Sequence, residues 1–229
     1  MTLFTGFPKE LPGFFNRLKQ NNTKAWFQAH KKEYETVVKV PSQEFVVAAG
    51  SRIAEFCPGI NAIPKVNKSL FRINRDTRFS KDKSPYKTNL GILFWDGPGK
   101  RMESSGFYFH LEDNGVMLGC GMHLFTKSAL QAFRDAVARK ESAKKLEQAV
   151  NTVTREGYLL GTKHYKRIPR GFDAHSDLEK EFLLYNGLTA RVDLEMDASF
   201  FSPGVVDMVT DHFKAMHPLH KWLVDTLQP

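Results

Sequence analysis

The segment GFYFHLEDNGVMLGCGMHLF, residues 106–125, constrains the fold more than any other part of the chain. Asn114-Gly115 is the pair favoured at the centre of a two-residue type I′ hairpin turn, and apolar and polar residues alternate on both sides of it. This turn places Asp113 opposite Val116. One face of the hairpin then collects the apolar side chains Phe107, Phe109, Leu111, Leu118, Cys120 and Met122. We therefore predict an antiparallel hairpin with this face in the core.

Helical patterns lie before and after the predicted strands. Leu11, Phe14, Phe15 and Leu18 have helical spacing, and Thr23 is placed to cap a second helix. Pro41 is predicted to break or kink the path before a helix at 45–56. The remaining predictions are strands at 90–96 and 188–196, one bent or two separate helices at 126–157, a short helix at 176–187, and C-terminal helices at 203–216 and up to 227.

These patterns predict the α+β class, an antiparallel β-sheet with helices before and after it. We expect one domain over residues 1–229. Its expected parts are a helical N-terminal part at about 8–56, a central sheet at about 66–125 and a helical C-terminal part at about 126–227.

The net charge of +8 is concentrated in two short segments. Residues 65–87 hold eight bases and two acids, and residues 163–172, KHYKRIPRGF, hold four bases and no acid. The rest of the chain has 21 bases and 23 acids. Clustering of this kind favours a focused anion site over charge that serves solubility alone.

The stretch FRINRDTRFSKDKSPYK, residues 71–87, is the centre of the predicted site. Arginine presents a planar fork that matches two phosphate or carboxylate oxygens, and lysine adds a point charge. In an extended conformation Phe71 and Ile73 point to one side. Asp76 is able to pair with either neighbouring arginine, and the ring of Tyr86 could cover a base or an apolar stem. The predicted ligand-binding residues are Arg72, Arg75, Asp76, Arg78, Ser80, Lys81, Lys83, Tyr86, Lys87, Arg167 and Arg170.

Two other interpretations of this stretch stay open. It could be a solvated, mobile loop, or a structural network in which Arg75, Asp76, Lys81 and Asp82 form ion pairs. Apolar anchors at Phe71, Ile73, Phe79, Pro85 and Tyr86 are interleaved with the charges, and a disordered run would carry fewer of them. We therefore favour an anion site.

The motif SLFRINRDTRFSKDKSPYK resembles the hallmark of domain-of-unknown-function family 2461, a group of bacterial and fungal proteins. FTGFPKE, NNTKAWFQAHKKEY and KRIPRGF are also similar to that family, so the resemblance covers nearly the full chain. It implies no activity, cofactor or catalytic residue.

The polar face of the predicted hairpin is a second candidate for chemistry. His110, Tyr108 and His123 are plausible proton-transfer groups, and glycines at 119 and 121 could leave a groove beside them. The alternative is that these glycines let a helix pack closely, with the histidines hydrogen-bonded at its edge. His212, His217 and His220 have poor spacing for a metal, so we predict no metal site. No short motif identifies a cofactor.

The composition and charge lead to three hypotheses of function. The first is binding of a phosphorylated or polycarboxylate small molecule, with catalysis left open. The second is a nucleic-acid-binding module without catalysis, and the third is a scaffold for an acidic protein partner. No stretch of about 18 apolar residues exists, so we expect no membrane span. Two cysteines and no secretory signal favour free thiols and a cytoplasmic location. The oligomeric state is not indicated.

Overall fold

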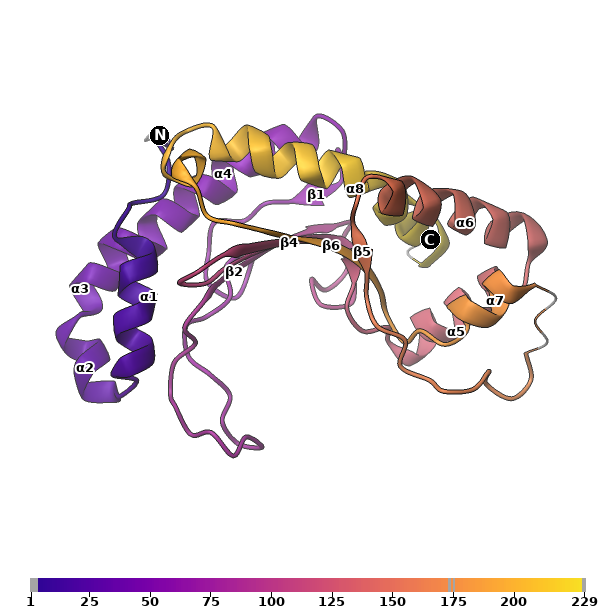
Figure 1. Cartoon of the computed structure of the whole chain (residues 1–229), viewed down its shortest axis with the longest axis horizontal. Helices are drawn as coiled ribbons and strands as arrows, with labels where there is room; N and C mark the ends of the chain where they lie inside the picture. The colour runs from indigo at the N-terminus through magenta and orange to yellow at the C-terminus, as the bar shows by residue number, and fades with distance from the viewer. Residues whose placement is uncertain (1–3, 173, 175, 228–229) are drawn as a thin grey trace. The chain divides into compact units, whose positions relative to one another are not determined.

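The computed structural model describes residues 4–172, 174 and 176–227. It contains helices and a six-stranded sheet, which confirms the predicted α+β class (Figure 1). The chain divides into two compact units. The first holds residues up to 94, with 108–118 and 193–211, and the second holds 95–107, 119–192 and the residues from 212 onward. That the whole chain folds as one domain stays a prediction.

The helices are α1 (Leu11–Gln20), α2 (Lys24–Ala29), α3 (Lys31–Glu33), the π-helical turn η1 (Tyr34–Lys39), α4 (Val40–Ala54), α5 (Lys127–Val137), α6 (Lys140–Arg155), α7 (Asp177–Phe182), the 3₁₀ turn η2 (Ala198–Phe201) and α8 (Val205–Leu227). The strands are β1 (Ile60–Asn61), β2 (Leu90–Asp96), β3 (Gly106–Leu111), β4 (Val116–Met122), β5 (Leu159–Leu160) and β6 (Leu188–Leu194). Their order in the sheet is β1-β2-β3-β4-β6-β5.

The N-terminal helices of the first unit follow the predicted spacing. The four apolar residues of α1 are buried, and the Thr23 hydroxyl accepts a hydrogen bond from Trp26 N–H, which caps α2. Aromatic packing holds this unit together: the ring of Phe45 lies 5.1 Å from Phe7 and 5.0 Å from Phe109, and the ring of Phe4 packs edge-on against Phe7. Side chains separated by about 100 residues therefore share one core.

Pro41 does not break the helical path, which was one of its two predicted effects. The path runs through the π-helical turn η1 into α4, and Pro41 lies in the first turn of α4. A kink at Pro41 stays a prediction. The predicted division of the C-terminal region into a helix at 203–216 and a further one up to 227 is wrong, because α8 is continuous and has Pro218 inside it. Met216, Leu219 and His220 are buried on either side of it, so packing compensates for the lost hydrogen bond.

The hairpin exists, but its turn differs from the prediction. Glu112 N–H donates to Gly115 O (3.0 Å), so the turn is centred on Asp113 and Asn114. The pairing of the two strands is therefore shifted by two residues from the predicted register. Neither Asn114 nor Gly115 has a positive φ, so the turn is not type I′. A shift of two residues preserves which side chains share a face. All six residues of the predicted core face are accordingly buried.

In the second unit, Thr126 caps α5 by accepting from Ala129 N–H, and Ser176 caps α7 by accepting from Glu179 N–H. Two separate helices, α5 and α6, occupy 127–155. In the antiparallel pair β5–β6, Leu159 lies opposite Arg191. The two-residue strands β1 and β5 were not predicted.

Over the described ranges, with residues 173 and 175 and both chain ends set aside, no helix is long and apolar enough to cross a membrane.

Candidate functional site

Residues 71–87 form a two-stranded basic arm that precedes β2 (Figure 1). Lys87 N–H donates to Ile73 O (2.8 Å), and Arg75 N–H donates to Pro85 O (2.9 Å). Asn74 pairs with Tyr86 in antiparallel fashion between them. Burial alternates from residue 71 to residue 78, as the extended conformation predicts, with Phe71 and Ile73 more buried than Arg72 and Asn74. The basic stretch is therefore an ordered antiparallel arm.

Two arginines of the basic arm are paired with its two acids. The Arg78 guanidinium donates to Asp76 through Nε (2.9 Å) and Nη2 (2.7 Å), so Asp76 pairs with Arg78 and not with Arg75. Arg75 instead pairs with Asp82 and also donates to Ser84 O (3.3 Å). These four side chains thus form ion pairs within the arm. The Asp76–Arg78 pair is one of the two that were expected for Asp76, whereas the Arg75–Asp82 pair was not predicted.

Both carboxyl groups of the basic arm have pKa values below the usual range. Hydrogen bonds from Arg78 lower the pKa of Asp76 to about 2. Hydrogen bonds from the Ser84 hydroxyl (2.6 Å) and backbone N–H (2.9 Å), followed by that from Arg75, lower the pKa of Asp82 to about 2. Both groups are therefore anionic at neutral pH and offset part of the arm's positive charge.

A single amide side chain fastens the basic arm to the corner between α1 and α2. Asn22 Nδ2 donates to Tyr86 O (2.9 Å), and Tyr86 N–H donates back to Asn22 Oδ1 (3.1 Å). The Tyr86 ring stacks on Phe27 with centroids 4.1 Å apart and is only 5% exposed. Tyr86 therefore packs into the core and does not present a free ring, as its expected role over a base would need.

Replacing Asn22 with alanine is expected to loosen the basic arm. Two backbone groups of Tyr86 would lose their partner, at a cost of about 1–3 kcal/mol in local stability. Amide hydrogen exchange at Arg75 and Lys87 should then become faster. Asn21→Ala is the matched control, because the neighbouring Asn21 side chain donates to Arg17 O within its own helix turn (3.0 Å). Equal exchange in the two variants would contradict the role of Asn22.

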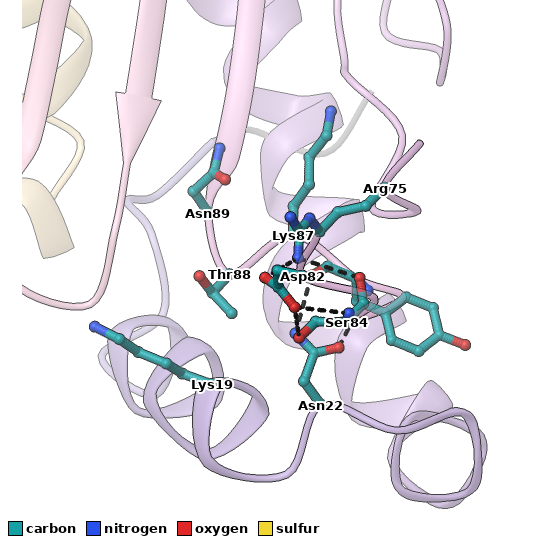
Figure 2. A pocket seen from close by; sticks show the side chains of 9 residues that line it. Lys19, Asn22, Arg75, Asp82, Ser84, Lys87, Thr88 and Asn89 are labelled. Atoms are coloured by element: carbon teal, nitrogen blue, oxygen red, sulfur yellow. Dashed lines mark hydrogen bonds and ion pairs between the residues drawn. The ribbon is translucent and has the colours of Figure 1, made fainter. Parts of the chain in front are cut away.

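A polar pocket of about 350 Å³ lies beside the arm, within the first unit (Figure 2). Its lining residues are Lys19, Asn22, Arg75, Asp82, Ser84, Tyr86, Lys87, Thr88 and Asn89. Three of the predicted ligand-binding residues, Arg75, Tyr86 and Lys87, are in this set. The other predicted residues of the basic arm are not: Arg72, Asp76, Arg78, Ser80, Lys81 and Lys83. The other six lining residues were not predicted to bind a ligand, and no local sequence signal distinguishes them: Lys19, Asn22, Asp82, Ser84, Thr88 and Asn89.

The ammonium groups of the two pocket lysines lie near an aromatic ring and a carboxylate. Figure 2 shows Arg75, Asp82, Ser84 and Asn22 meeting closely, while the Lys87 side chain extends away from them. Its ammonium lies 5.1 Å from the centre of the Phe71 ring. Lys19 Nζ lies 3.5 Å from Asp113 Oδ2, and this lysine side chain is 63% exposed. Such long, flexible stems can bring either ammonium to a bound anion.

A hydrogen-bonded chain on the polar face of β3 reaches the edge of the pocket. A carboxylate only accepts, so His110 Nε2–H donates to Glu112 (2.9 Å) and Nδ1 accepts from the Tyr108 hydroxyl (3.1 Å). Asn89, which lines the pocket, lies 3.4 Å from the same Nδ1. Burial, with a smaller contribution from Glu112, raises the pKa of Tyr108 to about 12. Two of the three predicted proton-transfer groups are thus connected to each other.

The other predicted residues belong to the second unit. His123, Arg167 and Arg170 are exposed there, and none of them lines the pocket. The expected groove at Gly121 is absent, because the backbone of β6 fills that space. A side-chain Cβ on Gly121 would lie 2.2 Å from Leu188 O. The alternative of close packing is the correct one at Gly121, although the neighbour is a strand.

A buried constellation that the sequence did not reveal lies in the second unit. Asp96 accepts from His220 Nε2–H (3.2 Å), and His220 Nδ1 therefore accepts from the Ser105 hydroxyl (2.9 Å). Burial is the main cause that lowers the pKa of His220 to about 4. These residue types match a hydrolytic triad, but Ser105 is 0% exposed and cannot meet a substrate in this conformation. We assign the three residues to stability.

These features define an α+β protein in which a basic antiparallel arm is anchored on a helical corner beside a polar pocket. The family model described as "Conserved hypothetical protein (DUF2461)" matches residues 10–222. The chain therefore belongs to the DUF2461 family, as its motifs indicated. A search of curated proteins finds no match to this sequence.

Proposed function

We propose that the pocket beside the basic arm binds a small anionic molecule, phosphorylated or polycarboxylate. The observation that carries this proposal is the lining itself. Lys19, Arg75 and Lys87 supply three positive charges against the single negative charge of Asp82. The hydroxyl and amide groups of Ser84, Thr88 and Asn89 add hydrogen-bonding capacity around them.

In this proposal Asp82 acts as an internal competitor for Arg75. An anionic ligand would carry oxygens like those of the Asp82 carboxylate, which already contacts the Arg75 guanidinium. A ligand oxygen that replaced it would meet the same planar donor. The Lys19 and Lys87 ammonium groups would then turn toward the ligand.

Replacing Asp82 with asparagine is expected to tighten anion binding about fivefold, since removing a like charge about 4 Å away in a water-exposed site is worth about 1 kcal/mol. Asparagine retains a side-chain oxygen for the Ser84 N–H and hydroxyl. The binding of citrate, pyrophosphate and inorganic phosphate is measured by calorimetry and by thermal shift.

Asp76→Asn is the matched control. It makes the same charge change in the same arm and releases Arg78, but Asp76 does not line the pocket. Its affinity for these anions should stay within about twofold of the wild type. Lower stability of Asp82→Asn without any anion binding would instead support a purely structural role for Arg75 and Asp82.

We also propose a reducing cytoplasm as the compartment. Cys57 and Cys120 are both buried free thiols, which fits that environment.

A further inference from the structure

Phe79 is exposed to a degree that the fold does not explain. It is 96% exposed at the tip of the basic arm, whereas the next most exposed large apolar side chains of the described residues, Leu124 and Leu159, are each 58% exposed. Burying a phenylalanine contributes about 1.5–3 kcal/mol, and the folded chain gains none of it at this position. A side chain of this kind is available to a partner.

The tip that carries Phe79 is ordered by its own contacts. Lys83 Nζ donates to Thr77 O (2.9 Å) and links the two sides of the tip. The Arg78 guanidinium, held by Asp76, lies 5.7 Å from the centre of the Phe79 ring. The backbone on either side of Phe79 is therefore held by these contacts, and the ring lies beside a paired arginine.

The surroundings of the ring are cationic. Residues 71–87 contain six bases and two acids, and Arg78, Lys81 and Lys83 lie within four residues of Phe79. An exposed aromatic ring among cations is the combination that binds single-stranded nucleic acid, where bases stack on the ring and phosphates meet the charges. A bilayer would gain little from one inserted ring, because stable membrane binding needs a larger buried apolar surface.

We propose that the tip of the basic arm binds single-stranded nucleic acid. A base stacks on Phe79, and the adjoining phosphates contact Arg78, Lys81 and Lys83. This site is separate from the proposed small-anion pocket, because none of these four residues lines that pocket. Either proposal can therefore fail without the other.

The first test measures the fluorescence anisotropy of a labelled oligothymidylate of about 15 nucleotides with the full chain at about 50 mM salt. Phe79→Ala should weaken binding about tenfold, since stacking on one ring is worth about 1–3 kcal/mol per base. Phe79→Trp should retain the wild-type affinity. Phe79→Leu should behave like Phe79→Ala, because leucine keeps apolar area but offers no flat ring.

Leu159→Ala is the control for losing an exposed apolar side chain, and it should leave the affinity unchanged. Because both Phe79 and Leu159 are exposed, the three Phe79 variants and Leu159→Ala should all melt within a few degrees of the wild type. A Phe79→Leu variant that binds as tightly as the wild type would overturn the stacking model. So would a wild type that does not bind the oligonucleotide, or one that binds only vesicles of phosphatidylserine and phosphatidylcholine.

The salt dependence separates the ring from the charges. The logarithm of the affinity should fall linearly with the logarithm of salt concentration, and Lys81→Ala should reduce that slope by about 0.7. Phe79→Ala should leave the slope as it is in the wild type. A slope that changes in Phe79→Ala but not in Lys81→Ala would contradict the assigned roles.

Discussion

Replacing His220 with glutamine is expected to remove much of the acid sensitivity of this protein. Burial lowers the pKa of His220 from its ordinary value of about 6.5 to about 4, so the folded state favours the neutral ring. Between about pH 6.5 and pH 4, His220 is protonated in the unfolded chain but stays neutral in the folded chain. The stabilisation is therefore fully present above pH 6.5 and is lost progressively down to about pH 4. The shift corresponds to about 3 kcal/mol.

The measurement is the free energy of unfolding by urea at pH 7 and at pH 4, compared between variants. Wild type should lose about 3 kcal/mol more than His220→Gln over this range. Glutamine should itself lower the stability at pH 7, because Ser105 and Asp96 lose their partner. Ser105→Ala is the control: it removes one hydrogen bond but keeps the imidazole, and should retain the wild-type acid sensitivity. If the free energy of unfolding had the same pH dependence in wild type and His220→Gln, His220 would not be the source of the acid sensitivity.

Replacing Gly121 with alanine is expected to destabilise the second unit by about 2–5 kcal/mol. Gly121 has φ of +115°, which costs an alanine about 1–2 kcal/mol. The added Cβ would also lie 2.2 Å from Leu188 O and 3.0 Å from Thr189 Cα, which are backbone atoms of the neighbouring strand. They can move only if β4 and β6 separate, at a further cost of about 1–3 kcal/mol.

Gly157→Ala isolates the conformational part of that cost. Gly157 also has a positive φ, of +90°, but nothing lies within 4 Å of a Cβ added there. It should lose only about 1–2 kcal/mol in the same urea titration. If the two variants were equally stable, the close approach of β6 to Gly121 would carry no energetic weight.

Local patterns in the sequence predicted the parts of the fold that depend on local physics. The spacing of the apolar residues in α1 and the Thr23 cap were sufficient for two helices, and the residues of β2 were predicted to the residue. The errors arose where packing overrides local preference. A break at Pro41 and two separate C-terminal helices were expected, but buried neighbours hold the helical path on both sides of Pro41 and Pro218.

The candidate site was predictable only in its charge. Clustering of bases pointed to residues 71–87. No local sequence pattern showed that Asp82 would form an ion pair with Arg75, or that only part of the segment would line a pocket. Lys19 contributes from α1, and Asn22 from the corner between α1 and α2, and both lie more than fifty residues before Arg75 in the chain. Such contacts follow from tertiary packing, which residue periodicity does not encode.

The pairing of Asn22 with Tyr86 also bears on the order in which the chain becomes structured. Two residues 64 positions apart meet there, so forming this contact closes a long loop and carries a large entropy cost. Closure is repaid only if the corner between α1 and α2 already exists to receive Tyr86. The arm and its pocket are therefore expected among the later parts to assemble during folding, after the N-terminal helices.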